Sequence, residues 1–260
     1  MTNLPATDAG QPPISPNAYI LLAAWIASGA GLVMVPQAAG VLTFVFVILG
    51  WVLAVVAHEF GHALVAHHAG DPTIAEKGYL NLDPLKYADL GVSLVIPVIA
   101  VVLGGIGFPG GAVYLREDLM RNRTWRSAAS LAGPLGTFVV LLLLSLAIGL
   151  ALPRLAGGMD SPLIPALAFL AFLQATALIL NLLPVPGLDG YGIIRPWLPR
   201  QVRQATAKYE GLAMMALLAL LFFVPPAANL FFGIAFLVAH AVGVPLEAVQ
   251  AGYKAFRFWS

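Results

Sequence analysis

The chain has 260 residues, of which 60% are hydrophobic and only 10% charged, and its mean hydropathy is +0.90. Soluble domains carry about 25% charged residues, so this composition excludes an ordinary water-soluble globule. The net charge is +1 and no Lys or Arg precedes Lys77, which excludes the basic surface that a nucleic-acid partner would require. Because there is no cysteine, any metal ion must be held by His, Asp or Glu.

Residues 1–17 are polar, contain prolines and lack the basic segment of a cleavable signal peptide, so we expect a short flexible tail. Six apolar runs follow. Each is predicted to cross the lipid bilayer, whose roughly 30 Å hydrocarbon core takes about 20 helical residues. They predict an all-α polytopic membrane protein with a single transmembrane domain at residues 18–246. The runs cover residues 18–35, 41–66, 124–152, 162–183, 208–224 and 229–244.

A further apolar run, Gly91–Phe108, is short for a membrane span. Pro97 lies in its middle and glycines lie at its end, and both residue types interrupt regular helices. The run is therefore either a seventh helix or a re-entrant element that enters and leaves the bilayer on one side.

Basic residues gather in three segments between or after the apolar runs. Lys and Arg in short loops favour the cytoplasmic side of a membrane. Two predicted spans separate each segment from the next, so all three can face the cytoplasm, including a C-terminal tail at residues 247–260. We expect the chain to lie in the plasma membrane. The three segments contain Arg116, Arg121, Arg123 and Arg126, then Arg195, Arg200, Arg203 and Lys208, and finally Lys254 and Arg257.

The second apolar run ends near the sequence His58-Glu59-Phe60-Gly61-His62, which has the pattern H-E-x-x-H. On a helix the two histidines lie about 40° apart around the axis and one turn apart along it, so both imidazoles can reach one ion. Glu59 lies beside them and can reach a water molecule on that ion. This spacing predicts a zinc site with a general base.

Two other interpretations of this motif need no metal. Five-residue patterns occur by chance, and histidine can act as a polar contact between membrane helices. Ionisable residues inside a membrane helix are costly, however, and three of them within one and a half turns favour a functional site. The next histidines, His67 and His68, point away from this face and are expected near the membrane surface rather than on the metal.

Catalytic zinc usually takes three protein ligands, so a third must come from another part of the chain. Asp189 is the candidate, because it is the only carboxylate between Asp160 and Glu210. It lies in a segment rich in proline and glycine, Asn181–Gly190, which should end the fourth span and turn the chain back. Alone, an Asp before Gly is also typical of a turn or a helix cap.

A shared metal would fix the topology of the first half of the chain. The end of the second span and the end of the fourth would meet near the cytoplasmic face. The segment between the second and third spans must then leave and return on that face. Gly91–Phe108 is accordingly predicted as a re-entrant element, whose irregular backbone is buried in protein or lines a water-filled cavity.

These residues resemble the site-2 protease family of intramembrane zinc metalloproteases. The likeness covers about residues 41–200 and rests on the type and order of several motifs. They are HEFGH at 58–62, Gly70-Asp71-Pro72, Asn81-Leu82-Asp83-Pro84-Leu85, Ala132-Gly133-Pro134-Leu135 and the segment Asn181–Gly190, which ends in Leu-Asp-Gly.

The resemblance implies a catalytic core of three helices that holds zinc between His58, His62 and Asp189. It also implies that Glu59 is the general base of peptide-bond hydrolysis. The family commonly has Asn three residues after the Gly-Pro pair, where it is thought to hold the substrate backbone. This chain has Thr137 there, whose reach is shorter. Thr137 and Asn181 are the candidate substrate-binding residues.

We therefore expect a zinc endopeptidase that cuts single-pass membrane proteins in or near their membrane-spanning segments. Two alternatives remain: a membrane metal-binding or transport protein, and an inactive scaffold of the same fold. A transporter is expected to carry further ionisable residues through its spans, and these are few here. A scaffold is expected to lack a ligand or the base, and none is missing.

Overall fold

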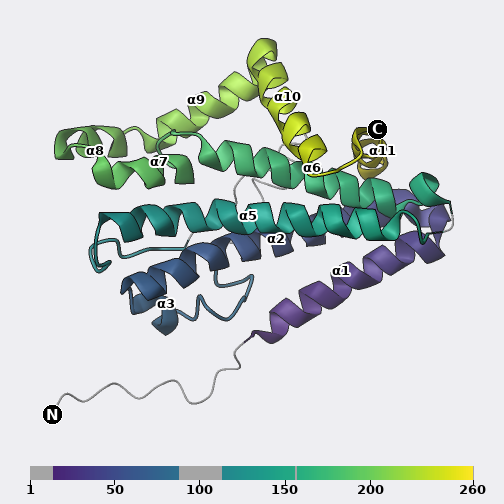
Figure 1. The fold of residues 1–260 in the computed structure, drawn as a ribbon, viewed down its shortest axis with the longest axis horizontal. Coiled ribbons are helices and arrows are strands. Elements are labelled where there is room, and N and C mark those ends of the chain that lie inside the picture. Colours follow the sequence, from purple (N-terminus) through teal and green to yellow (C-terminus); the bar gives the residue numbers. More distant parts are fainter. Residues whose placement is uncertain (1–13, 88–112, 156, 260) are drawn as a thin grey trace.

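The computed structural model describes residues 14–87, 113–155 and 157–259. All regular secondary structure in these ranges is helical (Figure 1), as the sequence predicted. The helices are α1 (Pro16–Met34), α2 (Ala39–Ala69), α3 (Thr73–Glu76), α5 (Arg123–Ala151), α6 (Leu163–Leu182), α7 (Asp189–Ile194), α8 (Arg200–Ala207), α9 (Glu210–Phe223), α10 (Pro225–Ala241) and α11 (Leu246–Phe256), with short 3-10 turns at Pro36–Ala38, Gly158–Asp160 and Arg195–Trp197.

Four of these helices are long and apolar enough to cross a membrane: α1, α2 with the turn before it, α5 and α6. They correspond to the first four predicted spans. The count rises to six if each of two bent helix pairs is one span. These pairs are α8 with α9, bent by 65°, and α10 with α11, bent by 119°.

The last two predicted spans differ most from their predicted form. α9 has 14 residues and is about 21 Å long at 1.5 Å per residue, short of the roughly 30 Å hydrocarbon core. Pro225 and Pro226 stop it, because proline cannot continue a helix but is well suited to the first turn of the next one. In Figure 1, α9 and α10 diverge from a common tip and form a V above the bundle.

α2, α5 and α6 run side by side and form the three-helix core that the family resemblance implied (Figure 1). Small residues bring α2 and α5 into backbone contact. A methyl group on Gly136 would lie 2.7 Å from the Ala57 carbonyl oxygen, and one on Gly61 would overlap the carbonyl of Ala132. Close approach through small residues is typical of membrane helix pairs, which gain no hydrophobic driving force from lipid.

α2 ends where α5 begins. Gly70 closes α2 with a left-handed backbone conformation (φ +112°), which glycine adopts without strain. The Arg121 N–H then donates to the Ala69 carbonyl at 3.0 Å, immediately before α5. The end of α2 and the start of α5 therefore lie at the same end of this helix pair. The predicted re-entrant element, Gly91–Phe108, lies outside the described residues.

The start of α1 is fixed to the segment after α3, where the sequence predicted a flexible tail up to residue 17. The Ser15 N–H donates to the Asn81 carbonyl at 2.8 Å, and the Asn17 side-chain amide donates to Asp83 at 3.1 Å. The proline at position 16 then opens the helix. Residues 14–17 are thus an ordered anchor.

The C-terminal segment forms a packed helix, α11, where the sequence predicted a cytoplasmic tail at residues 247–260. Phe256 and Val249 are buried in the main hydrophobic cluster, and Gly252 lies against the Pro165 carbonyl. This contact places α11 beside the first turn of α6, at the opposite end of the bundle from α7 (Figure 1). The third basic segment therefore does not share an end with the first two.

Candidate metal centre

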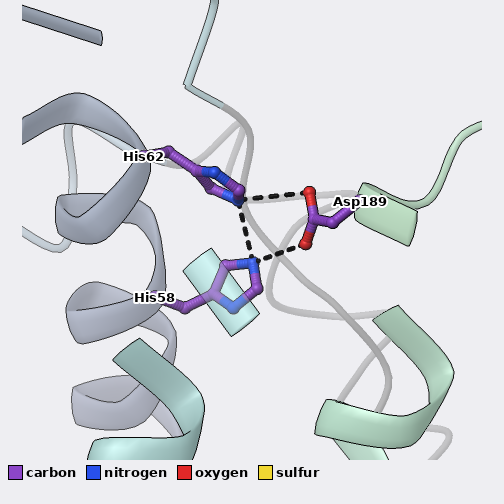
Figure 2. A group of neighbouring side chains, drawn as sticks. All are labelled: His58, His62 and Asp189. Carbon is purple, nitrogen blue, oxygen red and sulfur yellow. Dashed lines mark hydrogen bonds and ion pairs between the residues drawn. The ribbon is translucent and has the colours of Figure 1, made fainter. Parts of the chain in front are cut away.

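His58, Glu59 and His62 lie in the second half of α2, and all three side chains are buried. The two imidazoles project from one face of the helix toward Asp189 (Figure 2). This is the arrangement that the four-residue spacing predicted.

Asp189 reaches this face because the chain folds back after α6. α6 ends at Leu182, and Gly187 adopts a positive φ of +96° in the turn that follows. Gly190 then sits directly against the Leu182 carbonyl, in a space that no side chain could share. Asp189 is the first residue of α7, so its carboxylate points back toward the end of α2.

The ligand atoms of the three residues form a compact triangle. Nε2 of His58 lies 3.1 Å from Nε2 of His62, 3.1 Å from Oδ2 of Asp189, and Nε2 of His62 lies 3.2 Å from Oδ1 of Asp189. Zinc bonds of about 2.0 to 2.1 Å at tetrahedral angles would separate its ligand atoms by about 3.3 Å. The three residues therefore fit a zinc ion with only small adjustments.

Gly133 on α5 lies against one side of this group of ligand atoms. A methyl group there would overlap Nε2 of His62 and lie 2.7 Å from Nε2 of His58. Only hydrogen leaves room for both imidazole rings. The glycine of the Gly133-Pro134 pair therefore lies directly against the nitrogen atoms that would bind the metal.

The other ring nitrogens of the two histidines are held from α5. Nδ1 of His62 lies 2.7 Å from the Ala129 carbonyl, which can only accept, so this nitrogen carries the proton. Nδ1 of His58 lies 2.8 Å from the Thr137 hydroxyl, which can accept in the same way. With Nδ1 carrying the remaining proton, each Nε2 presents a lone pair once its ring is neutral, which is the form that binds a metal.

Glu59 is held by the segment that leads into α5. The backbone N–H of Val113 donates to Oε2 of Glu59 at 3.0 Å. Three residues on, the N–H of Arg116 donates to the buried Asp71 at 2.8 Å. Val113 to Arg116 form no helix or turn, so irregular backbone passes beside the carboxylate.

The Asp189 carboxyl lies outside the membrane-spanning helices and is strongly biased toward its charged form. Burial alone would raise its pKa, but the charge of His62 and the hydrogen bonds with both imidazoles hold the pKa well below its usual range. A charged carboxylate is the form that coordinates zinc.

The remaining predicted site residues have different neighbours. Thr137 contacts His58 directly and is buried, and its predicted contact with substrate, like that of Asn181, stays a prediction. Asn181 is buried on α6 and lines a small cavity with both of them. His67 and His68 stand outside the group of metal-ligating atoms, as predicted.

The sequence was not used to predict two features of the site: the hydrogen bond between His62 and the Ala129 carbonyl, and the space that Gly133 leaves for the imidazoles. The spacing of small residues on α5 could have indicated both. Ala129 and Gly133 are four residues apart on one face of an apolar helix, and small residues at this spacing predict close helix contact.

A buried pair of histidines and an aspartate, with a glutamate on the same helix face and among membrane helices, defines a membrane-embedded zinc metalloprotease. The chain is 43% identical to Rip2 of Mycolicibacterium smegmatis over 219 residues, which cover 84% of this chain and 82% of that protein. It is 42% identical to Rip2 of Mycobacterium tuberculosis over 239 residues, covering 91% and 88%.

It is also 28% identical to YwhC of Bacillus subtilis over 191 residues, covering 71% of this chain and 82% of that protein. All three relatives are named as zinc metalloproteases. The chain therefore belongs to the site-2 protease family, and it is a zinc metalloprotease. No family model matches the chain, and no solved structure matches it.

Proposed function

We propose that His58, His62 and Asp189 hold the catalytic zinc and that Glu59 is the general base of a peptidase acting within the membrane. The observation that carries this proposal is the triangle of ligand atoms, all within 4.8 Å of one another. Within residues 14–87, 113–155 and 157–259, no second group of three metal-ligating side chains is present, so a relay of sites for metal transport has no support.

Zinc in such a site supplies Lewis-acid chemistry: it polarises the scissile carbonyl and makes water more acidic. Glu59 accepts the proton of the attacking water on a carboxylate oxygen and delivers it to the nitrogen of the leaving amine. The Val113 N–H keeps Oε2 of Glu59 in place while the other oxygen stays available. Ala129 and Thr137 hold the imidazole rings in the orientation that the two ligands need.

The substrates in this proposal are membrane proteins with a single spanning helix. A helix has its carbonyls hydrogen-bonded internally, so the scissile segment must unwind before attack. The backbone from Val113 to Arg116 supports this step, because it lies beside Glu59 outside any helix or turn and an unwound peptide can pair with such backbone.

Reconstitution tests this function. The purified protein is placed in liposomes with a single-pass substrate, and cleavage fragments are mapped by mass spectrometry. We expect a cut in or at the edge of the spanning segment, and none with Glu59→Gln. Glu76→Gln, a matched change at an exposed glutamate on α3, should cleave normally. Cleavage restricted to soluble peptides would contradict the proposed substrate class.

We further propose that the site end of the bundle faces the cytoplasm in the plasma membrane. Basic residues concentrate there: Arg121 bonds to the end of α2, and Arg195 pairs with Glu117 at 2.8 Å. The cysteine-free chain allows a direct test with an impermeant maleimide on intact cells. We expect Arg154→Cys, beyond the far end of α5, to be labelled, and Arg200→Cys to be labelled only after permeabilisation. The reverse pattern would invert the topology.

A further inference from the structure

A small cavity lies beside His58 and beside the two turns of α2 that precede it. Its volume is about 20 Å³. A cavity needs about 10 to 15 Å³ to hold one water molecule, so there is room for one. The lining residues come from all three core helices, and those that carry polar groups are Trp51, His58, Thr137, Gln174 and Asn181.

Two hydrogen-bond donors in this lining have no partner within the protein. They are Nε1 of Trp51 and Nε2 of Gln174. Trp51 is 2% exposed and Gln174 is 1% exposed, so bulk water does not reach them. Burying an unsatisfied donor costs about 1 to 3 kcal/mol, and two such donors on residues that line one small space call for a shared acceptor.

The unsatisfied donors lie next to the metal site. Trp51 is seven residues before His58, two turns along the same face of α2, and Gln174 is seven residues before Asn181 on α6. Thr137, which bonds to Nδ1 of His58, lines the same space. The cavity therefore connects the two donors with the hydroxyl that orients His58.

We propose that this cavity binds one structural water molecule, which joins Trp51 and Gln174 to Thr137 and so positions His58. The water accepts from Trp51 and Gln174 with its two lone pairs. It donates to the hydroxyl oxygen of Thr137 and to the side-chain oxygen of Asn181. Four partners satisfy a buried water fully, and both orphan donors gain an acceptor. The effect on His58 rests on its proposed role as a zinc ligand, whereas the water site does not.

X-ray radiolysis tests the water directly, because hydroxyl radicals form from water bound beside a buried side chain. Trp51 is the probe, and Phe46, also 2% exposed but outside the cavity lining, is the internal reference. In the wild type we expect Trp51 to be oxidised several-fold faster than Phe46 after each rate is divided by the intrinsic reactivity of its ring. Equal, slow oxidation of both would overturn the water site, and this comparison needs no variant.

Gln174→Met keeps the side-chain length and removes the amide donor. It should slow Trp51 oxidation several-fold, while Leu173→Met, the same new side chain on the adjacent buried residue, should leave it unchanged. An unchanged rate in Gln174→Met would show that Gln174 does not hold the water.

Zinc release into a chelator tests the coupling to His58. Gln174→Met should release zinc faster, by a factor of up to about ten. Loss of a direct partner of a metal-ligating histidine typically costs about 10- to 100-fold, and Gln174 acts on His58 only through the water and Thr137. Thr137→Val removes the direct partner of His58 and should release zinc at least as fast, and the double variant should add little to the effect of Thr137→Val. Normal release in Gln174→Met would overturn the positioning role. If the wild type binds no zinc, the proposed function fails while the radiolysis result still decides the water site.

Discussion

A methyl group on Gly133 would lie 2.7 Å from Nε2 of His58, closer than any methyl carbon can approach a ring nitrogen. We therefore expect Gly133→Ala to displace the imidazoles and to abolish zinc binding. Protease activity should fall at least about 100-fold, because a displacement of about 1 Å in a catalytic group has that effect. Bound zinc per purified chain and the cleavage rate are the measurements.

Gly149→Ala is the matched control for this change. Gly149 lies on the same helix, α5, and a methyl group there meets nothing within 4 Å. Alanine favours a helix over glycine by about 1 kcal/mol, so this variant should bind zinc and cleave normally. Equal loss of zinc in both variants would mean that any glycine-to-alanine change in α5 disrupts the site. It would contradict the specific role of Gly133 in leaving space for the histidines.

Thr137→Val should weaken zinc binding, because valine has the shape of threonine without an acceptor for Nδ1 of His58. Loss of such a partner typically lowers metal affinity about 10- to 100-fold. Thr137→Ser keeps the hydroxyl and should restore most of the affinity. The measurement is zinc affinity by chelator competition. If serine fails as badly as valine, the side-chain methyl and not the hydrogen bond is what matters.

Asp71→Asn should loosen the backbone segment from Val113 to Arg116, which passes beside Glu59. The carboxylate of Asp71 is fully buried and accepts from the N–H and hydroxyl of Thr73 and from the N–H of Arg116. An amide group turns a donor toward one of these donors, so at least one bond is lost. We expect the Arg116 amide to exchange its hydrogen about tenfold faster or more, with slower proteolysis.

The control for this variant is Asp118→Asn. Asp118 is exposed and pairs with the Arg116 side chain, and such surface pairs contribute little. Exchange and activity should stay at wild-type values. Unchanged exchange of the Arg116 amide in Asp71→Asn would show that other contacts hold the segment from Val113 to Arg116.

The anchor at the start of α1 should resist acid. Burial raises the pKa of Asp83, but the Asn17 amide and the Leu85 N–H stabilise the carboxylate and lower the pKa below its usual range. A lowered pKa means that the contact contributes stability above about pH 4 and loses it only as pH falls through the folded value.

The protection factor of the amides at the start of α1, in which the intrinsic pH dependence of exchange is divided out, should therefore stay constant between about pH 5 and 8. It should fall only in more acidic solution. Asp83→Ala should give a lower protection factor than the wild type between about pH 5 and 8. A fall in the wild-type protection factor near pH 6 would contradict this account of the anchor.

The sequence predicts the first four spans well, because each is a continuous apolar run and membrane helices obey a simple length rule. His58 and His62 are also predictable, since their spacing fixes a common helix face. Asp189 follows less directly: its place in the chain suggests a turn, and only the need for a third ligand points to the metal.

The C-terminal region could not be predicted in the same way. α11 is amphipathic and short, and its burial depends on Gly252 meeting the Pro165 carbonyl, a contact that no local pattern encodes. The same holds for Thr137. Its position after the Gly-Pro pair predicts a contact with substrate, which stays a prediction, while its contact with His58 depends on how closely α5 approaches α2.

Zinc content in four purified proteins tests the central claim most directly. We expect about one zinc per chain in the wild type and in Glu59→Gln, because Glu59 is assigned as base and not as ligand. Asp189→Ala should lose the metal, and Asp160→Ala, which removes an exposed aspartate outside the site, should keep it. Full zinc retention in Asp189→Ala would contradict the three-residue metal centre.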